Sequence, residues 1–232
     1  MLDAAFAALA VGLSLLVPES APALAGPRES RPARGPRGPL IHPAGIFPGV
    51  VVLLGLWGMA GFITFLPLYM PAVGGGGAGG PLALYALIVV ALRIVGASWP
   101  DRFGAARLSG AALVVSALGL AIMGGIVSPI GLYAGTIVLA IGVAFTMPAI
   151  LALAVARVRP EERGSVVGTA TVFLDLVFGF APVALGYVAD AAGTGPARSA
   201  AAFPFSAATA AIAAGLLLAR RGALEAEAAA AA

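Results

Sequence analysis

The sequence predicts an all-α polytopic membrane protein, and three observations support this prediction. First, 61% of the 232 residues belong to the apolar set AVILMFWYC, and the mean hydropathy is +1.05. Second, only 10% of the residues are charged, which is too few to cover a water-facing surface, since soluble domains carry about 25%. Third, the apolar residues gather in stretches that reach the length of a membrane-spanning helix, about 20 residues. This composition excludes a soluble domain and a disordered chain.

Six apolar stretches approach or exceed the length of a membrane span. Strong helix-stop signals separate them, including PAVGGGGAGGP, SP, RPEERG and GTGP. We therefore expect a six-helix transmembrane domain over 46–222, followed by a cytoplasmic tail over 223–232. The expected spans cover 46–70, 82–99, 108–127, 130–156, 165–189 and 200–219.

A shorter apolar segment, 1–17, precedes these six stretches. Its core would be only about 20 Å long as a helix, so it spans a bilayer only if the first residues are drawn in. A signal peptide is one alternative, because PALAG at 22–26 resembles a cleavage site, although no basic residue precedes the apolar run. Another alternative is that Met1 lies partway through a longer protein.

All 13 basic residues are arginine, and their positions predict the orientation in the membrane. If the loops alternate between the two sides, one side receives eleven arginines and the other receives only Arg198, while Arg93 falls inside a span. Short cytoplasmic loops carry the basic excess. We therefore expect a multi-pass plasma-membrane protein whose Arg/Pro-rich linker, 18–45, and C-terminus are cytoplasmic. The eleven are Arg28, Arg31, Arg34, Arg37, Arg102, Arg107, Arg157, Arg159, Arg163, Arg220 and Arg221.

The composition also argues against several kinds of site. The chain has no cysteine and a single histidine, His42, which cannot form a zinc site alone, so we expect no metal and no cofactor. The arginines lie in short runs between apolar stretches, so nucleic acid is not an expected partner. An enzyme would need clustered catalytic side chains in or beside the spans, and the sequence offers no such cluster.

The strongest local motif is RIVGASWPDRFGAAR, at 93–107. Gly104 permits a tight reversal, and we expect Asp101 to end one helix. Arg102 and Arg107 would anchor at anionic lipid headgroups. By these properties alone, the motif is equally consistent with an ordinary hairpin on the cytoplasmic side.

This motif resembles the loop signature RxxGGxxxDRxGRR of major facilitator superfamily (MFS) transporters. Ala97, Pro100, Ala105 and Ala106 depart from the signature, which suits the weaker copy that follows the eighth helix of the family. The matching residues are Arg93, Gly96, Asp101, Arg102, Gly104 and Arg107.

The order of motifs along the chain extends the resemblance. GFITFLPLYMP at 61–71 is similar to the seventh helix of the family, and 159–190 looks like the entry and body of the eleventh. The resemblance implies a six-helix MFS-type C-terminal bundle, helices 7 to 12, with 1–17 as an extra helix before it. It implies a secondary transporter of a small solute, with proton-coupled efflux as one form of that activity. It also implies that the chain is a truncated half of a twelve-helix protein.

The resemblance also implies partners. They would be the lipid bilayer, a small-molecule substrate, and either the N-terminal half of the transporter or a second copy of this chain. The alternatives are a membrane remnant that transports nothing and a half-transporter that acts only as a dimer.

Asp175 is the only carboxylate deep inside an expected span, about 15 Å from the start of its helix and close to the midplane. Small or polar residues share its helix face within an arc of about 80°. Such a stripe permits close helix approach and would turn the carboxylate toward protein or water. Asp175 is therefore a proton-coupling candidate, with a structural hydrogen bond as the alternative. The other members of the stripe are Gly164, Gly168, Thr171, Gly179, Pro182 and Gly186.

Further roles follow from the resemblance. A Gly/Pro element in the eleventh helix accompanies domain rocking in the family, which makes Gly168, Gly179, Pro182 and Gly186 gating or packing candidates. The seventh and tenth helices line the cavity in the family, which makes three residues candidate substrate contacts, with packing as the alternative. Arg93 is expected to reach toward the interface rather than to pair with Asp175. The three substrate candidates are Thr64, Tyr69 and Thr146.

Overall fold

A computed structural model describes residues 41–231, and every regular element in this range is helical. Within the range, five helical segments are long and apolar enough to cross a membrane, and a sixth apolar helix, Gly79–Val95, is shorter. The predicted all-α membrane bundle is thus confirmed. The predicted first segment, 1–17, and most of the linker over 18–45 lie outside the described residues.

The first predicted span consists of two helices rather than one. α2 (Pro43–Gly55) ends just before Leu56, and α3 (Trp57–Ala72) begins just after it. Gly55 and Gly58 flank this break, and each is packed against a leucine of another helix. Glycine pairs are common sites of helix kinks, because they hold the helical conformation weakly. The expected span over 46–70 therefore lies within one candidate membrane span, Pro43–Ala72, which is interrupted at Leu56.

Each of the other five predicted spans contains one long helix. The last of them continues to Ala231 and includes the residues predicted as a tail, 223–231. In chain order the remaining elements are α4 (Gly79–Val95), α5 (Trp99–Phe103), α6 (Ala105–Gly125), α7 (Pro129–Val155), the 3₁₀ turn η1 (Pro160–Glu162), α8 (Arg163–Ala191), α9 (Pro196–Ala200) and α10 (Ala202–Ala231).

The turn after α4 corrects the role expected for Asp101. α4 already ends at Val95, and Asp101 lies in the first turn of the separate short helix α5. Pro100 occupies one of the first positions of α5, where its missing N–H leaves no hydrogen bond unmade. Gly104 has a φ of +84°, in the left-handed region, so the predicted reversal at this glycine is confirmed.

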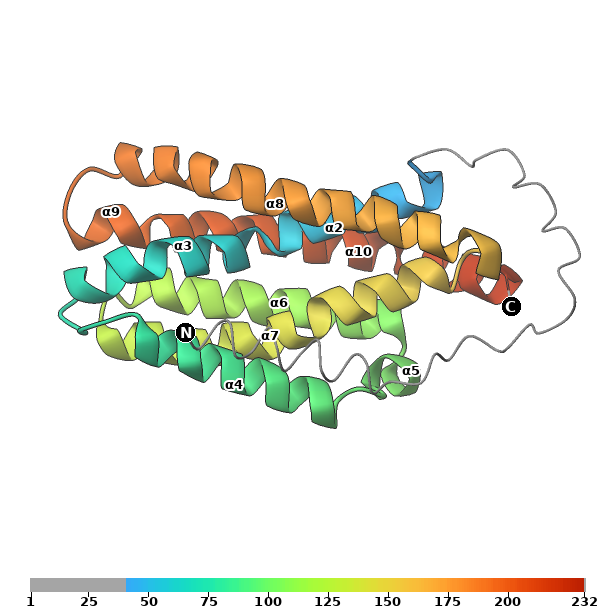
Figure 1. Cartoon of the computed structure of the whole chain (residues 1–232), viewed down its shortest axis with the longest axis horizontal. Coiled ribbons are helices and arrows are strands. Elements are labelled where there is room, and N and C mark those ends of the chain that lie inside the picture. Colours follow the sequence, from blue (N-terminus) through green and yellow to red (C-terminus); the bar gives the residue numbers. More distant parts are fainter. Residues whose placement is uncertain (1–40, 232) are drawn as a thin grey trace, which may run out of the picture. The chain divides into compact units, whose positions relative to one another are not determined.

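The long helices alternate in direction and pack side by side around α7 (Figure 1). α7 packs most extensively on α6 and also contacts α4 and α2, while α6 packs on α10 and α8 packs on α2 and α3. α4 and α8 lie at opposite edges of this bundle (Figure 1). Accordingly, α4 and α8 bury fewer side chains than α7 does.

Glycine allows the close approach of α6 to α7. A Cβ atom at Gly119 would lie 2.8 Å from the Gly135 carbonyl oxygen, and a Cβ at Gly135 would lie 2.6 Å from the Gly119 carbonyl oxygen. Small residues on facing helices commonly permit such backbone contact in membranes. A face of small residues on α7, which runs from Gly131 through Gly135 and Gly142 to Ala149, is buried.

The described arginines gather at one end of the bundle. Chain reversals place α5, η1 and the C-terminus at one end, which we call the α5 end, and place α9 and the 73–78 loop at the other, the α9 end (Figure 1). Arg198 lies at the α9 end, in α9 itself. The arginines of the α5 end are Arg102, Arg107, Arg157, Arg159, Arg163, Arg220 and Arg221.

Candidate functional site

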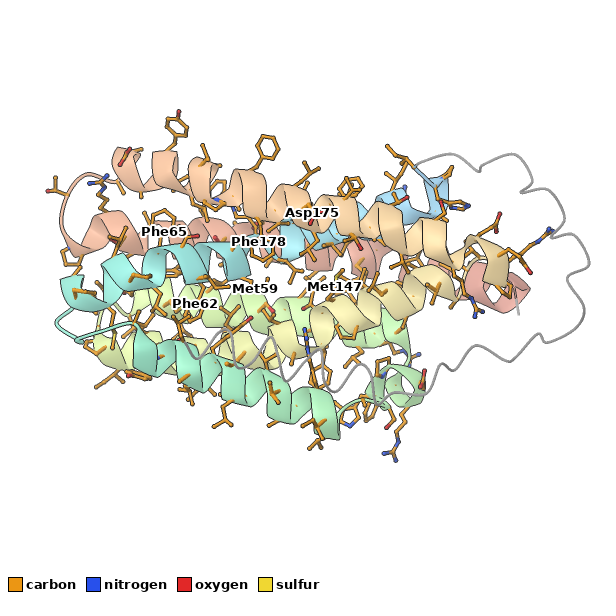
Figure 2. The ribbon with its side chains drawn as sticks, in the orientation of Figure 1. Met59, Phe62, Phe65, Met147, Asp175 and Phe178 are labelled. Carbon is orange, nitrogen blue, oxygen red and sulfur yellow. The ribbon has the colours of Figure 1, made fainter. Side chains whose placement is uncertain are left out.

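One face of the bundle lies between the edge helices α4 and α8. Figure 2 shows Met59 of α3, Met147 of α7, and Asp175 and Phe178 of α8 along this face, which we call the inter-edge face. Met59 and Met147 are half-buried, whereas Asp175 and Phe178 are exposed. The face therefore combines apolar side chains with one carboxylate.

Asp175 lies near the middle of α8 and is exposed. No hydrogen bond or ion pair within the described range engages its carboxylate. Its neighbours on the helix surface are apolar and also exposed, including Val172, Leu176 and Phe178. A carboxylate in such surroundings needs water or a protein partner, because hydrocarbon solvates it poorly.

The glycines of the stripe on α8 leave open space within the described bundle. A Cβ atom built at Gly168, Gly179 or Gly186 would have open space around it, without a neighbouring atom within 4 Å. The close helix approach expected from this stripe is therefore not made within the described residues. α8 also runs unbroken through Pro182.

The three candidate substrate contacts fall in different environments. Tyr69 is fully buried, and its hydroxyl donates to the Met123 carbonyl oxygen at 3.0 Å. Thr146 is also fully buried, and its hydroxyl donates to the Gly142 carbonyl oxygen at 2.9 Å. Only Thr64 is exposed. Packing inside the bundle therefore describes Tyr69 and Thr146 better than contact with a ligand.

A cavity of about 480 Å³ opens between α4 and α7. Arg93 is exposed and lines this cavity together with Phe145, Met147 and Leu151. The described residues include no ion pair between Arg93 and Asp175. Arg93 and Gly96 were singled out by the loop signature, whereas the α7 residues of this lining were not predicted, because nothing in the 145–151 segment distinguishes them from ordinary core residues.

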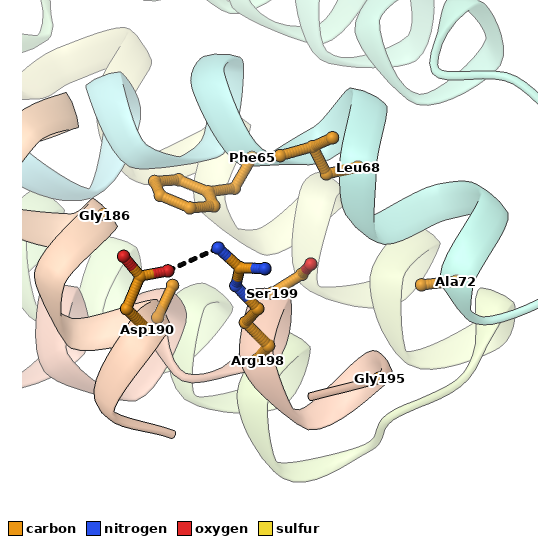
Figure 3. A pocket seen from close by; sticks show the side chains of 9 residues that line it. Phe65, Leu68, Ala72, Gly186, Asp190, Gly195, Arg198 and Ser199 are labelled. Atoms are coloured by element: carbon orange, nitrogen blue, oxygen red, sulfur yellow. Dashed lines mark hydrogen bonds and ion pairs between the residues drawn. The ribbon is translucent and has the colours of Figure 1, made fainter. Parts of the chain in front are cut away.

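A second cavity, of about 610 Å³, lies at the α9 end between α3, α8 and α9 (Figure 3). Phe65 and Leu68 of α3 line one side of it, and Asp190 and Arg198 line the other. The Arg198 guanidinium donates to the Asp190 carboxylate, and both side chains are exposed. The opposite charges on either side of the GTGP turn are the sequence signal from which this pair could have been predicted.

His42 has a structural role at the start of α2. Its backbone N–H donates to the Thr169 hydroxyl at 2.9 Å, and its Nδ1 accepts from the Ala44 N–H at 3.2 Å. Over residues 41–231, no three side chains of the metal-binding types come together.

These features define a class of protein: a multi-pass α-helical membrane bundle with a face that carries ionisable groups and that no other described residues cover. Comparison with known proteins then identifies the family. The profile of the Major Facilitator Superfamily matches residues 1–182 and 75–231, which together cover nearly the whole sequence. The chain therefore belongs to the major facilitator superfamily, whose members are transporters.

Curated relatives carry the same family name. The chain is 30% identical over 151 residues to the uncharacterized MFS-type transporter STM4428 of Salmonella typhimurium, which covers 64% of this chain and 39% of the relative. It is 28% identical over 145 residues to the uncharacterized MFS-type transporter YhhS of Escherichia coli, which covers 62% of this chain and 36% of the relative. The match thus spans under two fifths of the length of these relatives. No solved structure matches the chain significantly.

Proposed function

We propose that this chain forms one half of a secondary transporter that moves a small solute by alternating access. The observation that supports this most strongly is the uncovered, mid-height Asp175 on an edge helix. An aspartate left in hydrocarbon at the centre of a helix costs about 3 kcal/mol. A second helical bundle seated on the inter-edge face would remove Asp175 from lipid and enclose a path between the two halves.

The open stripe on α8 supports the same arrangement. Gly168, Gly179 and Gly186 leave room for another helix to approach closely, as small residues do at helix interfaces in membranes. The helix that uses this room would come from an N-terminal half or from a second copy of this chain. Pro182 would help α8 to bend as the two halves rock.

We further propose that Asp175 couples transport to protons. A carboxylate that alternates between a dry interface and a water-filled path can release and rebind a proton as the two halves move. The other described acids lie near helix ends, in loops or in the C-terminal part of α10, where they are in reach of water throughout such a cycle.

The orientation follows from the arginines. We propose that the protein lies in the plasma membrane and that its α5 end faces the cytoplasm. The cytoplasmic ends of membrane spans carry the excess of arginine. The C-terminus would then be cytoplasmic as well. The domain organisation that we propose is a spanning segment over 1–17, a cytoplasmic linker over 18–45, the six-helix domain over 46–222 and a tail over 223–232.

Proton flux in everted membrane vesicles tests the transport proposal without a known substrate. Vesicles containing the chain, alone or fused behind the N-terminal half of YhhS, are energised, and a pH-sensitive dye reports proton release when each solute of a panel is added. We expect at least one solute to cause release, Asp175→Asn to abolish it, and the matched variant Asp190→Asn to retain it. Unchanged flux in Asp175→Asn would exclude the coupling role, and no response from either protein would exclude transport.

A further inference from the structure

From the cavity between α4 and α7 we infer a binding site for an amphiphilic anion, a molecule with one phosphate or carboxylate group and an apolar chain. The inference rests on the proposed function in one respect, because it makes this anion the class of solute carried along the inter-edge face. The site itself is defined by the described residues alone.

The charge of the cavity comes from a single side chain. Arg93 belongs to the last turn of α4, a helix with no other charged residue, and no carboxylate within the described range pairs with it. An arginine near the end of a span reaches the interfacial region, where it can bind an anionic group. Its planar guanidinium offers two parallel N–H donors, which match the oxygens of a carboxylate or phosphate.

The rest of the cavity is apolar. Phe145, Met147, Pro148 and Leu151 of α7 form one wall, and Gly96, Ala97 and Pro100 of the turn after α4 contribute to the other. The volume of about 480 Å³ lies within the range of about 300–1,000 Å³ that is typical of small-molecule sites. A cavity with one cationic group and otherwise apolar walls selects a ligand with one anionic group and an apolar body.

The walls of this cavity are held in place by aromatic packing. The Trp99 indole stacks on the Phe145 ring with centroids 4.9 Å apart, and Trp99 also meets Phe103 edge-on at 5.9 Å. Gly96 is buried against Phe145, where an added Cβ atom would clash with the ring. The turn after α4 and the middle of α7 therefore form one packed unit beside Arg93, so the cavity exists before a ligand enters it.

Trp99 also makes the site measurable. In a Trp57→Phe background it is the only tryptophan of the chain. The probe is ω-bromoundecyl phosphate, an anion whose bromine quenches tryptophan emission, added to the full 232-residue chain in phosphatidylcholine nanodiscs. The matched cation, ω-bromoundecyl trimethylammonium, reports non-specific partitioning into the bilayer. We expect saturable quenching of Trp99 by the anion only.

Two variants remove the site in different ways. Arg93→Gln deletes the charge and should weaken probe binding about tenfold or more, as the loss of a charge-assisted hydrogen bond predicts. Ala97→Phe keeps the charge but fills the cavity and should also prevent saturable quenching. Arg163→Gln, at the same end of the bundle, and Ala91→Phe, on α4 away from the cavity, are matched controls that should bind as the parent does.

A second quenching experiment distinguishes a lipid of the bilayer from a dissolved solute as the source of the anion. Nanodiscs that contain dibrominated phosphatidylglycerol, compared with dibrominated phosphatidylcholine, report occupation by a bilayer lipid. If Arg93-dependent quenching occurs with phosphatidylglycerol, the ligand is a lipid headgroup, and if it occurs only with the added phosphate, the ligand is a solute. Equal quenching in the parent, Arg93→Gln and Ala97→Phe would overturn the inference.

The quenching experiment measures binding in nanodiscs without a proton gradient. Its result therefore does not depend on whether the protein transports a solute. Saturable binding without solute-dependent proton flux would contradict the transport proposal but would still support the binding site. Proton flux that persists in a chain with no Arg93-dependent binding would overturn the site and leave the transport proposal standing.

Discussion

The indole of Trp99 lies flat against the ring of Phe145, with 10° between the two planes. This contact joins the start of α5 to the centre of α7, which makes the loop motif part of the packed bundle. The motif recognised in the sequence as a loop signature therefore also shapes the wall of a cavity. Several predictions about packing and orientation come from contacts of this kind.

We expect Phe145→Ala to shift the Trp99 emission to longer wavelength, because the indole loses its apolar neighbour. The lost ring contact is worth about 1 kcal/mol beyond the area that it buries. The emission spectrum and the thermal unfolding midpoint, both measured in a Trp57→Phe background, test this. Phe178→Ala, on an exposed face of α8, is the control and should leave both quantities unchanged. A spectrum that does not move in Phe145→Ala would contradict the stacking.

Gly119→Ala should destabilise the protein by about 1–3 kcal/mol, since the added methyl group meets the backbone of α7 and overpacking carries that cost. Gly135→Ala should do the same from the other side. Gly179→Ala is the matched control, because its methyl group enters open space and alanine favours the helix. Unfolding in mild detergent measures all three, and equal midpoints would show that α6 and α7 do not approach this closely.

The same Gly179→Ala variant distinguishes the stability of this chain from its association with a second helical bundle. If another bundle seats on the α8 stripe, the variant should lower solute-dependent proton flux severalfold while the unfolding midpoint of the chain stays unchanged. Phe180→Ala, at an exposed side chain about 100° around the helix from Gly179, is the control for the flux measurement. Full flux in Gly179→Ala would indicate that the partner does not approach α8 at this glycine.

Tyr69→Phe should lower the free energy of unfolding by about 1 kcal/mol, the usual net value of one hydrogen bond. It removes the hydroxyl that donates to the Met123 carbonyl oxygen and leaves the ring on Phe203 in place. Tyr187→Phe, at a side chain that is 73% exposed, is the control. If Tyr69→Phe altered solute specificity but not stability, the hydroxyl would be a substrate contact after all.

Single cysteines should report opposite sides of the membrane at the two ends of the bundle. The chain has no native cysteine, so Gly77→Cys at the α9 end and Glu161→Cys at the α5 end can each be labelled alone. Gly77 is preferred to Gly76, whose φ of +79° disfavours a side chain. In intact cells, an impermeant maleimide should modify position 77 and spare position 161. The reverse pattern would invert the proposed orientation.

The sequence was most informative where structure depends on composition along the chain. Six apolar stretches and the stop signals between them correspond closely to the helices, because hydrocarbon thickness sets the length of each span independently of its neighbours. The separation of Arg198 from the other described arginines follows from the alternation of these helices. The break at Leu56 and the short helix α5 were missed, since both depend on how glycines and prolines pack rather than on hydropathy.

For the candidate site, the sequence identified individual residues but not their surroundings. Asp175, Arg93 and the α8 stripe could be selected from the sequence because charged and small residues are unusual in spans. Their surroundings could not be predicted, and neither could the burial of Tyr69 and Thr146, because periodicity places a residue on a helix face without saying which helix covers that face.

By itself, then, the sequence determined that this chain is a helical membrane protein, where its spans lie and which end of the bundle carries its charge. These properties come from the free energy of transferring each segment between water and lipid, which is local. Only the tertiary structure decided that, among residues 41–231, no helix covers Asp175 and the α8 glycines, and that Arg93 borders a cavity with Phe145. Those are properties of helix packing, which brings together residues that are far apart in the chain.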